Sequence, residues 1–391
     1  MANFISMVDN IKMNTPIYLD YNATTPIDKR VADTMLPYLY GSFGNPSSSH
    51  QFGVQAKMVV ETARRQIALV LGAVSAEIIF TSGGTESNNL AIRGYCLNNM
   101  QKGSHIITSA IEHPAVLDVC SSLVEDGFEL TVLPVDQYGM VDPQDLISAL
   151  RSDTILVSIM HANNEVGTIQ PIQELTKITH QAGAVFHCDA AQSVGKIRVN
   201  VDELGVDLLS VAGHKLYAPK GVGALYIRTG IQIVKITQGA GHERNLRPGT
   251  ENVLEIAGLG KAAEIVKQDL DVNFQHLKEM RDRLQRGIFA NVEENSARVN
   301  GHPNLNLPNT LSISFRNQQA NNLLSGISAM VAASAGAACH ADQINISNVL
   351  AAMNVPVEWA MGTLRFSVGR ETTLEEIDFA THVICQAVKK I

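Results

Sequence analysis

A turn with two glycines follows a short apolar run of the sequence at 78–81. The glycines, the second of which is Gly84, let the backbone approach a ligand, and Thr85 is predicted to cap the helix that follows. A helix N-terminus presents free N–H groups and the positive end of the helix dipole, which together favour a phosphate. A glycine turn with a threonine cap is also a common strand-to-helix connection, so this turn indicates a phosphate site only in combination with other residues.

Three further apolar runs are followed by an amide, a carboxylate and an amine. These are Asn164, Asp189 and Lys215, after runs that end near 160, 187 and 211. Taken singly, Asp189 is explained as a helix cap and Lys215 as a surface lysine. In an open α/β sheet, however, the residues that follow the strands gather at one edge. Together they match an aldehyde cofactor with a phosphate and a pyridine nitrogen, because a lysine can attach to the aldehyde and a carboxylate can keep the ring nitrogen protonated.

Two other classes of enzyme fit the sequence less well. A nicotinamide oxidoreductase needs a G-x-G-x-x-G turn between an early strand and a helix, whereas the similar stretch at 221–223 leads into a strand. A metal hydrolase would use His187 and Asp189, but the sequence offers no third ligand nearby and no H-E-x-x-H motif. We therefore expect no metal site.

Short β-branched runs alternate with amphipathic stretches from residue 77 onward, which is typical of βαβ units around a mostly parallel sheet. The predicted strands lie at 78–80, 106–108, 130–133, 155–159, 185–186, 208–211 and 224–227. These runs are almost continuously apolar, so we expect the strands to be buried on both faces. The expected fold class is α/β, with a large α/β/α sandwich over 16–262.

A small α+β domain is expected from 1–15 together with 263–391. A charged amphipathic segment at 261–289 predicts the helix that leads into this domain. Strand-like runs follow at 310–315 and 363–368. The chain should therefore fold as two domains of unequal size.

The composition favours a globular protein of a reducing compartment. The 391 residues carry a net charge of −8 with dispersed lysines and arginines, so neither nucleic acid nor an anionic membrane is an expected partner. The 5 cysteines contain no C-x-x-C pair and predict no disulfide framework. The sequence shows no secretory signal and no run long enough to cross a membrane, so we expect a cytoplasmic protein.

Several motifs resemble those of one enzyme family in order and spacing. They lie at 19–26, 43–48, 81–89, 112–113, 213–215, 247–252 and 365–370. In these stretches the sequence resembles the cysteine desulfurases and selenocysteine lyases of the class V aminotransferase group, which are fold-type I enzymes that use pyridoxal 5′-phosphate (PLP). The resemblance extends from about residue 18 to the C-terminus.

The resemblance implies a role for four residues around the cofactor ring. Lys215 would attach to the aldehyde of PLP, and Asp189 would pair with the ring nitrogen. Gln192 would donate a hydrogen bond to the phenolic oxygen. His113 would stack on the ring and take part in catalysis.

The resemblance also implies which residues hold the phosphate. Gly84, Thr85 and His214 would bind it from the same chain. Thr250 would reach it from the other subunit of a homodimer. One departure falls here, because Ala212 stands where desulfurases usually have a serine, and we expect one phosphate hydrogen bond to be missing.

The substrate and its sulfur involve three more residues by resemblance. Arg365, with Asn164, would bind the substrate carboxylate. Cys339 matches the nucleophile, which the family carries on a mobile loop, here 334–342. The small residues around Cys339 favour an approachable thiol, whereas the other four cysteines are interpreted as structural. The residues 340–342 depart from typical desulfurases, and the stretch 337–340 is more similar to selenocysteine lyases.

The function that these motifs imply is conversion of L-cysteine to L-alanine, with the sulfur held as a persulfide on Cys339. The sulfur would then pass to an acceptor protein, for iron–sulfur cluster assembly, tRNA thiolation or another use. Two alternatives stay open. One is a selenocysteine lyase, which releases selenide from L-selenocysteine. The other is a non-catalytic scaffold, against which the retention of Lys215, Asp189 and Cys339 argues.

Overall fold

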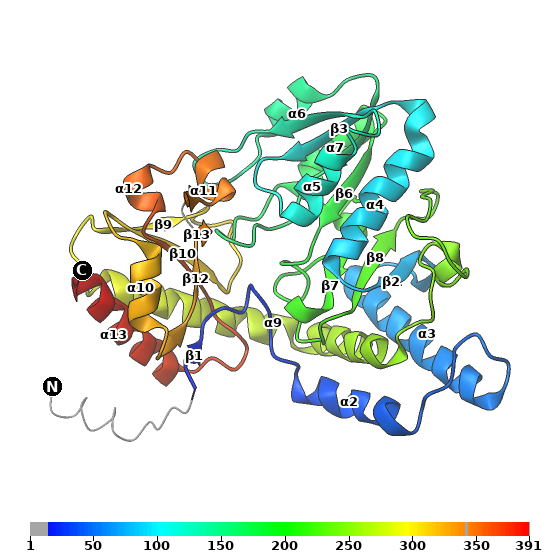
Figure 1. Ribbon diagram of the computed structural model, residues 1–391, viewed down its shortest axis with the longest axis horizontal. Helices are drawn as coiled ribbons and strands as arrows, with labels where there is room; N and C mark the ends of the chain where they lie inside the picture. The colour runs from blue at the N-terminus through cyan, green and yellow to red at the C-terminus, as the bar shows by residue number, and fades with distance from the viewer. Residues whose placement is uncertain (1–14, 341–342, 391) are drawn as a thin grey trace.

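The computed structural model describes residues 15–340 and 343–390, and for 337–340, 343–345 and Lys390 it describes the backbone alone. The chain forms two units, each built on its own sheet, and helix α9 (Val253–Phe289) runs along both of them (Figure 1). Among the described residues, no helix combines the length and the apolar character needed to cross a membrane.

The larger unit contains a seven-stranded sheet in the order β2-β8-β7-β6-β5-β3-β4. Its strands are β2 (Ile78–Thr81), β3 (His105–Ser109), β4 (Glu129–Leu133), β5 (Thr154–Ser158), β6 (Val185–Asp189), β7 (Leu208–Ala212) and β8 (Gly223–Ile227). Only β8 runs antiparallel to its neighbours, and the four pairs from β7 to β4 are parallel. The mostly parallel sheet agrees with the prediction.

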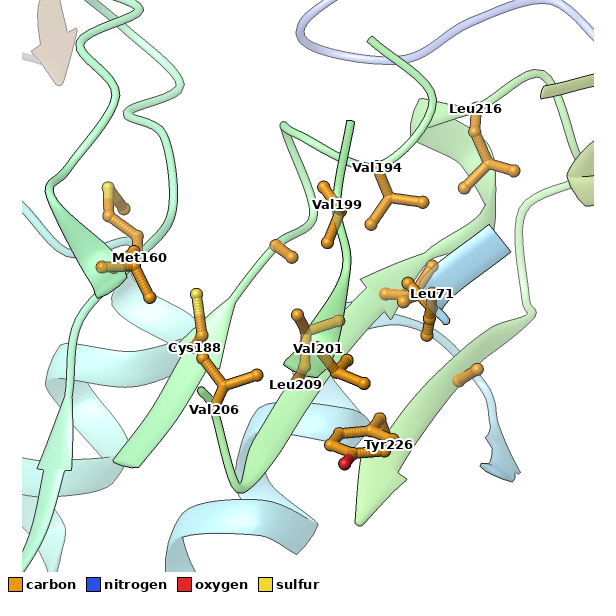
Figure 2. Packing of buried hydrophobic residues seen from close by; sticks show 14 of the residues in the cluster. Leu71, Met160, Cys188, Val194, Val199, Val201, Val206, Leu209, Leu216 and Tyr226 are labelled. Carbon is orange, nitrogen blue, oxygen red and sulfur yellow. The ribbon is translucent and has the colours of Figure 1, made fainter. Parts of the chain in front are cut away.

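Helices cover both faces of this sheet because consecutive strand residues point to opposite sides. Ile106 packs with α4 (Gly84–Asn99) and α5 (Pro114–Ser122) on one face. Its neighbour Ile107 belongs to the larger cluster on the other face, part of which Figure 2 shows around Cys188 and Leu209. That second cluster includes residues of α3 (Gln51–Leu71), α7 (Ile172–Gln181) and the first half of α9. The result is the α/β/α sandwich expected from the sequence.

Strand β4 is an exception to the predicted burial on both faces. Glu129 and Val132 are exposed, and only the last residue of the strand, Leu133, is buried. The reason is its place in the sheet, because β4 forms one edge and pairs with β3 alone.

The smaller unit is built on a four-stranded antiparallel sheet in the order β12-β15-β10-β9. The strands are β9 (Ala297–Asn300), β10 (Thr310–Phe315), β12 (Ser334–Ala335) and β15 (Thr363–Ser367). Helices α10 (Ala320–Ile327) and α13 (Leu374–Lys390) contribute to its core together with the second half of α9. The remaining helices are α2 (Lys29–Tyr40), α6 (Pro143–Ala149), α8 (Val201–Leu204), α11 (Asn348–Ala352) and α12 (Val357–Ala360).

The start of α9 differs from the prediction, which placed this helix at 261–289. The helix begins at Val253, and the Asn252 side chain accepts a hydrogen bond from the Glu255 N–H at its N-terminus. Most residues of the first two turns are apolar or small and several are buried, so the charged amphipathic pattern begins only later in the helix.

The N-terminal segment packs with the smaller unit. Strand β1 (Ile17–Tyr18) pairs with β11 (Val331–Ala332), and Ile17 and Leu19 belong to the core of that unit. The predicted boundary after residue 262 falls inside α9. The division into 16–262 and 1–15 with 263–391 stays a prediction, and residues 1–14 lie outside the described part.

Candidate active site

A cavity of about 410 Å³ lies where the strand ends of the large sheet meet the N-terminus of α4. It brings together nine of the residues that the sequence singled out. These are Gly84, Thr85, His113, Asn164, Asp189, Gln192, His214, Lys215 and Arg365. Eight of them lie at or after strand ends of the large sheet, which share one edge, and Arg365 comes from β15 of the smaller unit.

The N-terminus of α4 forms one part of the cavity wall. Helix α4 begins at Gly84, and no side chain caps it, because the N-cap position is Gly83 with φ at 150°. The prediction that Thr85 caps this helix is therefore wrong: Thr85 lies inside the first turn. Its hydroxyl does not serve as the helix cap and lines the cavity beside an N-terminus suited to an anion.

Ala212 lies beside this anion-binding turn. A Cβ atom added to Gly84 would come within 3.3 Å of the Ala212 Cβ atom. The departure from serine thus lies next to the proposed phosphate position. The expected loss of one phosphate hydrogen bond stays a prediction.

His214 is uncharged at neutral pH, because burial and then the nearby Lys215 lower its pKa to about 4. Its Nδ1 atom lies 3.1 Å from the Thr24 hydroxyl. A neutral imidazole can still offer a hydrogen bond to a phosphate through its other nitrogen.

The carboxylate of Asp189 is held by two donors. The Asn88 amide donates to Oδ2 at 2.8 Å, and the Ala191 N–H donates to Oδ1 at 2.9 Å. Sequence reasoning gave Asn88 no role. The available signal was its position one turn into α4 after Gly84, which places it on the face that packs on the sheet.

Lys215 points its amine at the N-terminal segment. Its Nζ atom donates to the backbone carbonyl oxygens of Asn22, at 2.5 Å, and Ala23, at 2.7 Å. Burial, followed by the positive charge of Arg365, lowers the Lys215 pKa to about 8. A much larger fraction of this amine is neutral and nucleophilic at pH 8 than of an ordinary lysine.

His113 caps helix α5, where its Nδ1 atom accepts a hydrogen bond from the Ala115 N–H at 3.1 Å. The protonated nitrogen is then Nε2. Burial is the main cause that lowers the pKa of His113, so the ring is neutral at physiological pH. A neutral ring on the cavity wall is compatible with the predicted stacking role.

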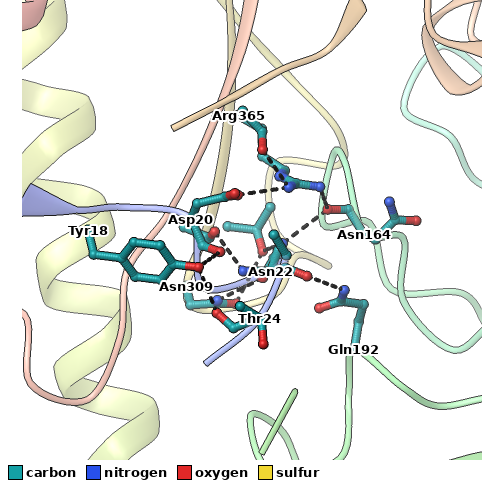
Figure 3. A network of polar contacts seen from close by, with 12 residues as sticks. Tyr18, Asp20, Asn22, Thr24, Asn164, Gln192, Asn309 and Arg365 are labelled. Carbon is teal, nitrogen blue, oxygen red and sulfur yellow. Dashed lines mark hydrogen bonds and ion pairs between the residues drawn. The ribbon is translucent and has the colours of Figure 1, made fainter. Parts of the chain in front are cut away.

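The Arg365 guanidinium has donors left for a ligand beyond those that it uses within the chain. It binds the Asp20 carboxylate at 2.8 Å, the Ser334 hydroxyl at 3.0 Å and the Asn164 carbonyl oxygen at 3.1 Å (Figure 3). Its buried Nε atom has no hydrogen-bond partner among the described residues. An unpaired buried donor is costly, and a substrate carboxylate would satisfy it.

Thr250 does not line the cavity of its own chain. It is exposed, between the short helix η4 (Glu243–Asn245) and α9. Its predicted role depends on a second subunit.

Cys339 lies on a strand, and the mobility of the segment 334–342 stays a prediction. Strands β13 (Ala337–His340) and β14 (Gln343–Ile346) form a hairpin in which Cys339 pairs with Ile344. Small residues allow the extended backbone, and β12 just before it pairs with β15, with Ser334 opposite Arg365. The Cys339 side chain and residues 341–342 of the predicted loop lie outside the described part.

The four other cysteines and His187, which was considered as a metal ligand, have structural roles. Cys96, Cys120, Cys188 and Cys385 are free and buried, and burial raises the pKa of each thiol. The ring nitrogens of His187 contact the hydroxyls of Ser158 and Ser210. Within the described ranges, no group of three or more potential ligands could hold a metal ion.

The profile of the class-V aminotransferase family matches residues 17–379. The chain belongs to this family. This membership confirms the predicted family, and with it the predicted cofactor, PLP, and a PLP-dependent enzyme. The cavity fits that group, since it offers an amine, a carboxylate and a helix N-terminus together.

The chain is similar to named relatives over almost its full length. It is 49% identical to the cysteine desulfurase IscS of Dictyoglomus turgidum, over 97% of this chain and 96% of the relative. It is 46% identical to the cysteine desulfurase IscS of Methanosarcina thermophila, over 97% of this chain and 93% of the relative. A solved structure described as a NifS-like protein superposes with a TM-score of 0.90 at 37% identity, covering 96% of this chain and 100% of that one. The predicted fold class is therefore confirmed.

Proposed function

We propose that this chain is a PLP-dependent cysteine desulfurase that converts L-cysteine to L-alanine and receives the sulfur on Cys339. The observation that carries the proposal is the convergence of Lys215, Asp189 and the α4 N-terminus on one cavity whose wall also contains Arg365. The names of the two relatives bear out the predicted activity.

When bound, PLP supplies an aldehyde that an amine can attach to and a protonated ring that accepts electrons. Lys215 provides the attaching amine and, once the substrate has displaced it, takes the α-proton. Asp189, oriented by Asn88, keeps the ring nitrogen protonated. Gly84, Thr85 and His214 would hold the phosphate.

The substrate is oriented and its sulfur removed by further residues of the chain. Arg365 and Asn164 bind the carboxylate of the amino acid, which uses the free Nε donor. The thiolate of Cys339 attacks the substrate sulfur, so an S–S bond forms while the C–S bond breaks. The electron pair of that bond stays on carbon, which takes up a proton and leaves as alanine. An acceptor protein then receives the sulfur from Cys339.

The proposal is tested by incubating the purified, PLP-loaded protein with L-cysteine and a thiol reductant. We expect alanine and sulfide in equal amounts, because the reductant releases each persulfide after it forms. L-Serine serves as the control substrate, since it keeps the carboxylate and the amine but has no sulfur. Consumption of cysteine without alanine would contradict the proposal.

A selenocysteine lyase is the second candidate. The observation in its favour is Ala212 on the cavity wall, where desulfurases usually have serine. We favour cysteine as the substrate. A non-catalytic scaffold is opposed by the retention of the complete set of cavity residues. The cytoplasmic location stays a prediction from the sequence.

We further propose a homodimer with composite sites. Thr250 is exposed and absent from the cavity of its own chain. Large apolar side chains are also exposed in and around α2 and α3, which suits an interface. They include Leu39, Tyr40, Phe43, Phe52 and Met58.

Mixed dimers test this arrangement. Lys215→Ala removes the amine that attaches to PLP. Thr250→Asp removes the proposed phosphate contact, and its added carboxylate repels the phosphate. If Thr250 serves the partner's site, a heterodimer of the two variants contains one intact site and should recover about half of wild-type activity per dimer. Sedimentation should show dimers at assay concentration. An active monomer, or no recovery in the heterodimer, would refute the composite site.

A further inference from the structure

Lys196 is a buried lysine beside the cavity to which neither the sequence nor the family profile assigned a role. Its side chain is only 5% exposed, and its Nζ atom donates to Gln192 Oε1 at 2.6 Å and to Asn22 Oδ1 at 3.1 Å. Among the residues that the structure describes, no carboxylate pairs with it. Burying an amine without an ion pair costs free energy, so the burial of Lys196 needs a compensating benefit.

The two partners of Lys196 both lead to proposed site residues. The Gln192 Nε2 atom donates to the Asn22 carbonyl oxygen at 3.0 Å, which also accepts from Lys215. The Asn22 amide donates to the carbonyl oxygen of Asn164, which also accepts from Arg365. Figure 3 shows Asn22 at the centre of this network. Lys196 thus binds Gln192 directly and reaches Lys215 and Asn164 through Asn22.

The contact with the Lys196 amine bears on which end of the Gln192 carboxamide faces the cavity. A carboxamide has a donor end and an acceptor end of almost the same shape, and its environment selects which way it points. The Lys196 amine donates to Oε1, so the oxygen end of the amide faces Lys196. The Nε2 end is then directed away from Lys196, as its bond to the Asn22 carbonyl oxygen shows. That donor end is the one a phenolic oxygen requires.

The Asn22 amide is oriented in the same way. Its Oδ1 atom accepts from both Lys196 and Asn309, at 3.1 Å and 2.9 Å, so its Nδ2 atom is left to donate to the Asn164 carbonyl oxygen and to Thr310. Two donors on one oxygen fix the amide more firmly than one.

We infer that Lys196 is a positioning residue of the desulfurase reaction: it holds the Gln192 amide with its donor end available to the phenolic oxygen of PLP. The inference rests on the proposed function. Lys196 itself does not contact the cofactor or the substrate in this arrangement. It acts through Gln192.

The test uses Lys196→Met, which keeps the length of the side chain and removes its donors. The readout is the pH midpoint of the visible absorbance change of the PLP-loaded protein. A donor to the phenolic oxygen stabilises its anionic form, so losing an oriented donor should move the midpoint upward by about 0.5–1 pH unit. Lys220→Met, which removes an exposed lysine near His214, is the matched control and should leave the midpoint unchanged.

A double-mutant cycle separates positioning from a simple charge effect. If Lys196 acts through Gln192, Lys196→Met should add almost nothing to the shift of Gln192→Ala. If the two shifts add fully, Lys196 acts through space and the inference is overturned. Should Lys196→Met not fold, Lys196→Ala replaces it in the same cycle, because it also removes the donors to Gln192 and Asn22. That variant should also shift the midpoint upward, and an unchanged midpoint would overturn the inference.

Different results would refute the proposed function and the role of Lys196. A wild-type protein that binds no PLP would refute the proposed function itself. A wild-type protein that binds PLP and forms alanine, with additive shifts in the cycle, would refute only the role of Lys196.

Discussion

Replacing Lys215 by alanine should abolish covalent attachment of PLP and lower alanine formation by about 10⁴-fold, the upper range for loss of a positioned proton-transfer group. The amine is both the point of attachment and the proposed base, so no neighbouring side chain can replace it. Borohydride reduction followed by mass spectrometry of peptides should find the cofactor on Lys215 in the wild-type protein and nowhere in the variant. A borohydride-stable adduct in Lys215→Ala would exclude Lys215 as the attachment point.

The pH dependence of attachment follows from the same side chain. Burial lowers the Lys215 pKa to about 8, so the amine loses its proton as the pH rises through that value. Only the neutral amine attacks an aldehyde. Addition of PLP to the apoprotein should therefore accelerate up to about pH 8 and level off above it. Acceleration that continued toward pH 10.5 would show that the amine titrates as an ordinary lysine.

Replacing Cys339 by alanine should lower alanine formation from cysteine by at least about 10³-fold, as removal of a nucleophile does in other covalent mechanisms. A cysteine thiol is a poor leaving group and needs a thiolate to extract its sulfur. A selenol ionises more readily and the C–Se bond is weaker, so the variant should retain part of its activity on selenocysteine. Alanine is measured from both substrates with both proteins.

The controls separate three outcomes of the Cys339 experiment. Cys385→Ala, which removes a buried thiol of the smaller unit, should leave desulfuration intact. A wild-type protein that ignores cysteine and consumes selenocysteine would support the lyase alternative. If Cys339→Ala removes sulfur from cysteine at the wild-type rate, another group is the nucleophile.

The sequence predicted the large sheet and five of the nine cavity residues from local patterns, whereas the family resemblance supplied His113, Gln192, His214 and Arg365. Apolar runs mark the strands, and the residues just after them share an edge whatever the details of packing. Asn88, Lys196 and Asn22 could not be assigned in this way. Apart from Gln192, which lies four residues from Lys196, their partners lie far away in the chain, as with the Asn22 amide and Thr310, 288 residues apart. Such pairs depend on how the two units pack together.

The errors also have physical reasons. Thr85 was predicted as a cap from its residue type, but the capping position is Gly83, two residues earlier, and the helix begins at Gly84. The predicted burial of β4 came from its composition, which does not reveal that it forms an edge.

The hydrogen bonds of Asn22 also bear on how the protein matures during synthesis. Its backbone N–H donates to the Ser367 hydroxyl, 345 residues further along the chain. At a translation rate of about 5–20 residues per second, roughly 20–70 s separate the synthesis of these two residues. The seven strands of the large sheet are complete at residue 227, so this sheet can form on the ribosome while its cavity still lacks one wall. Binding of the substrate carboxylate, which needs Arg365 of β15, must therefore wait for translation of this last strand.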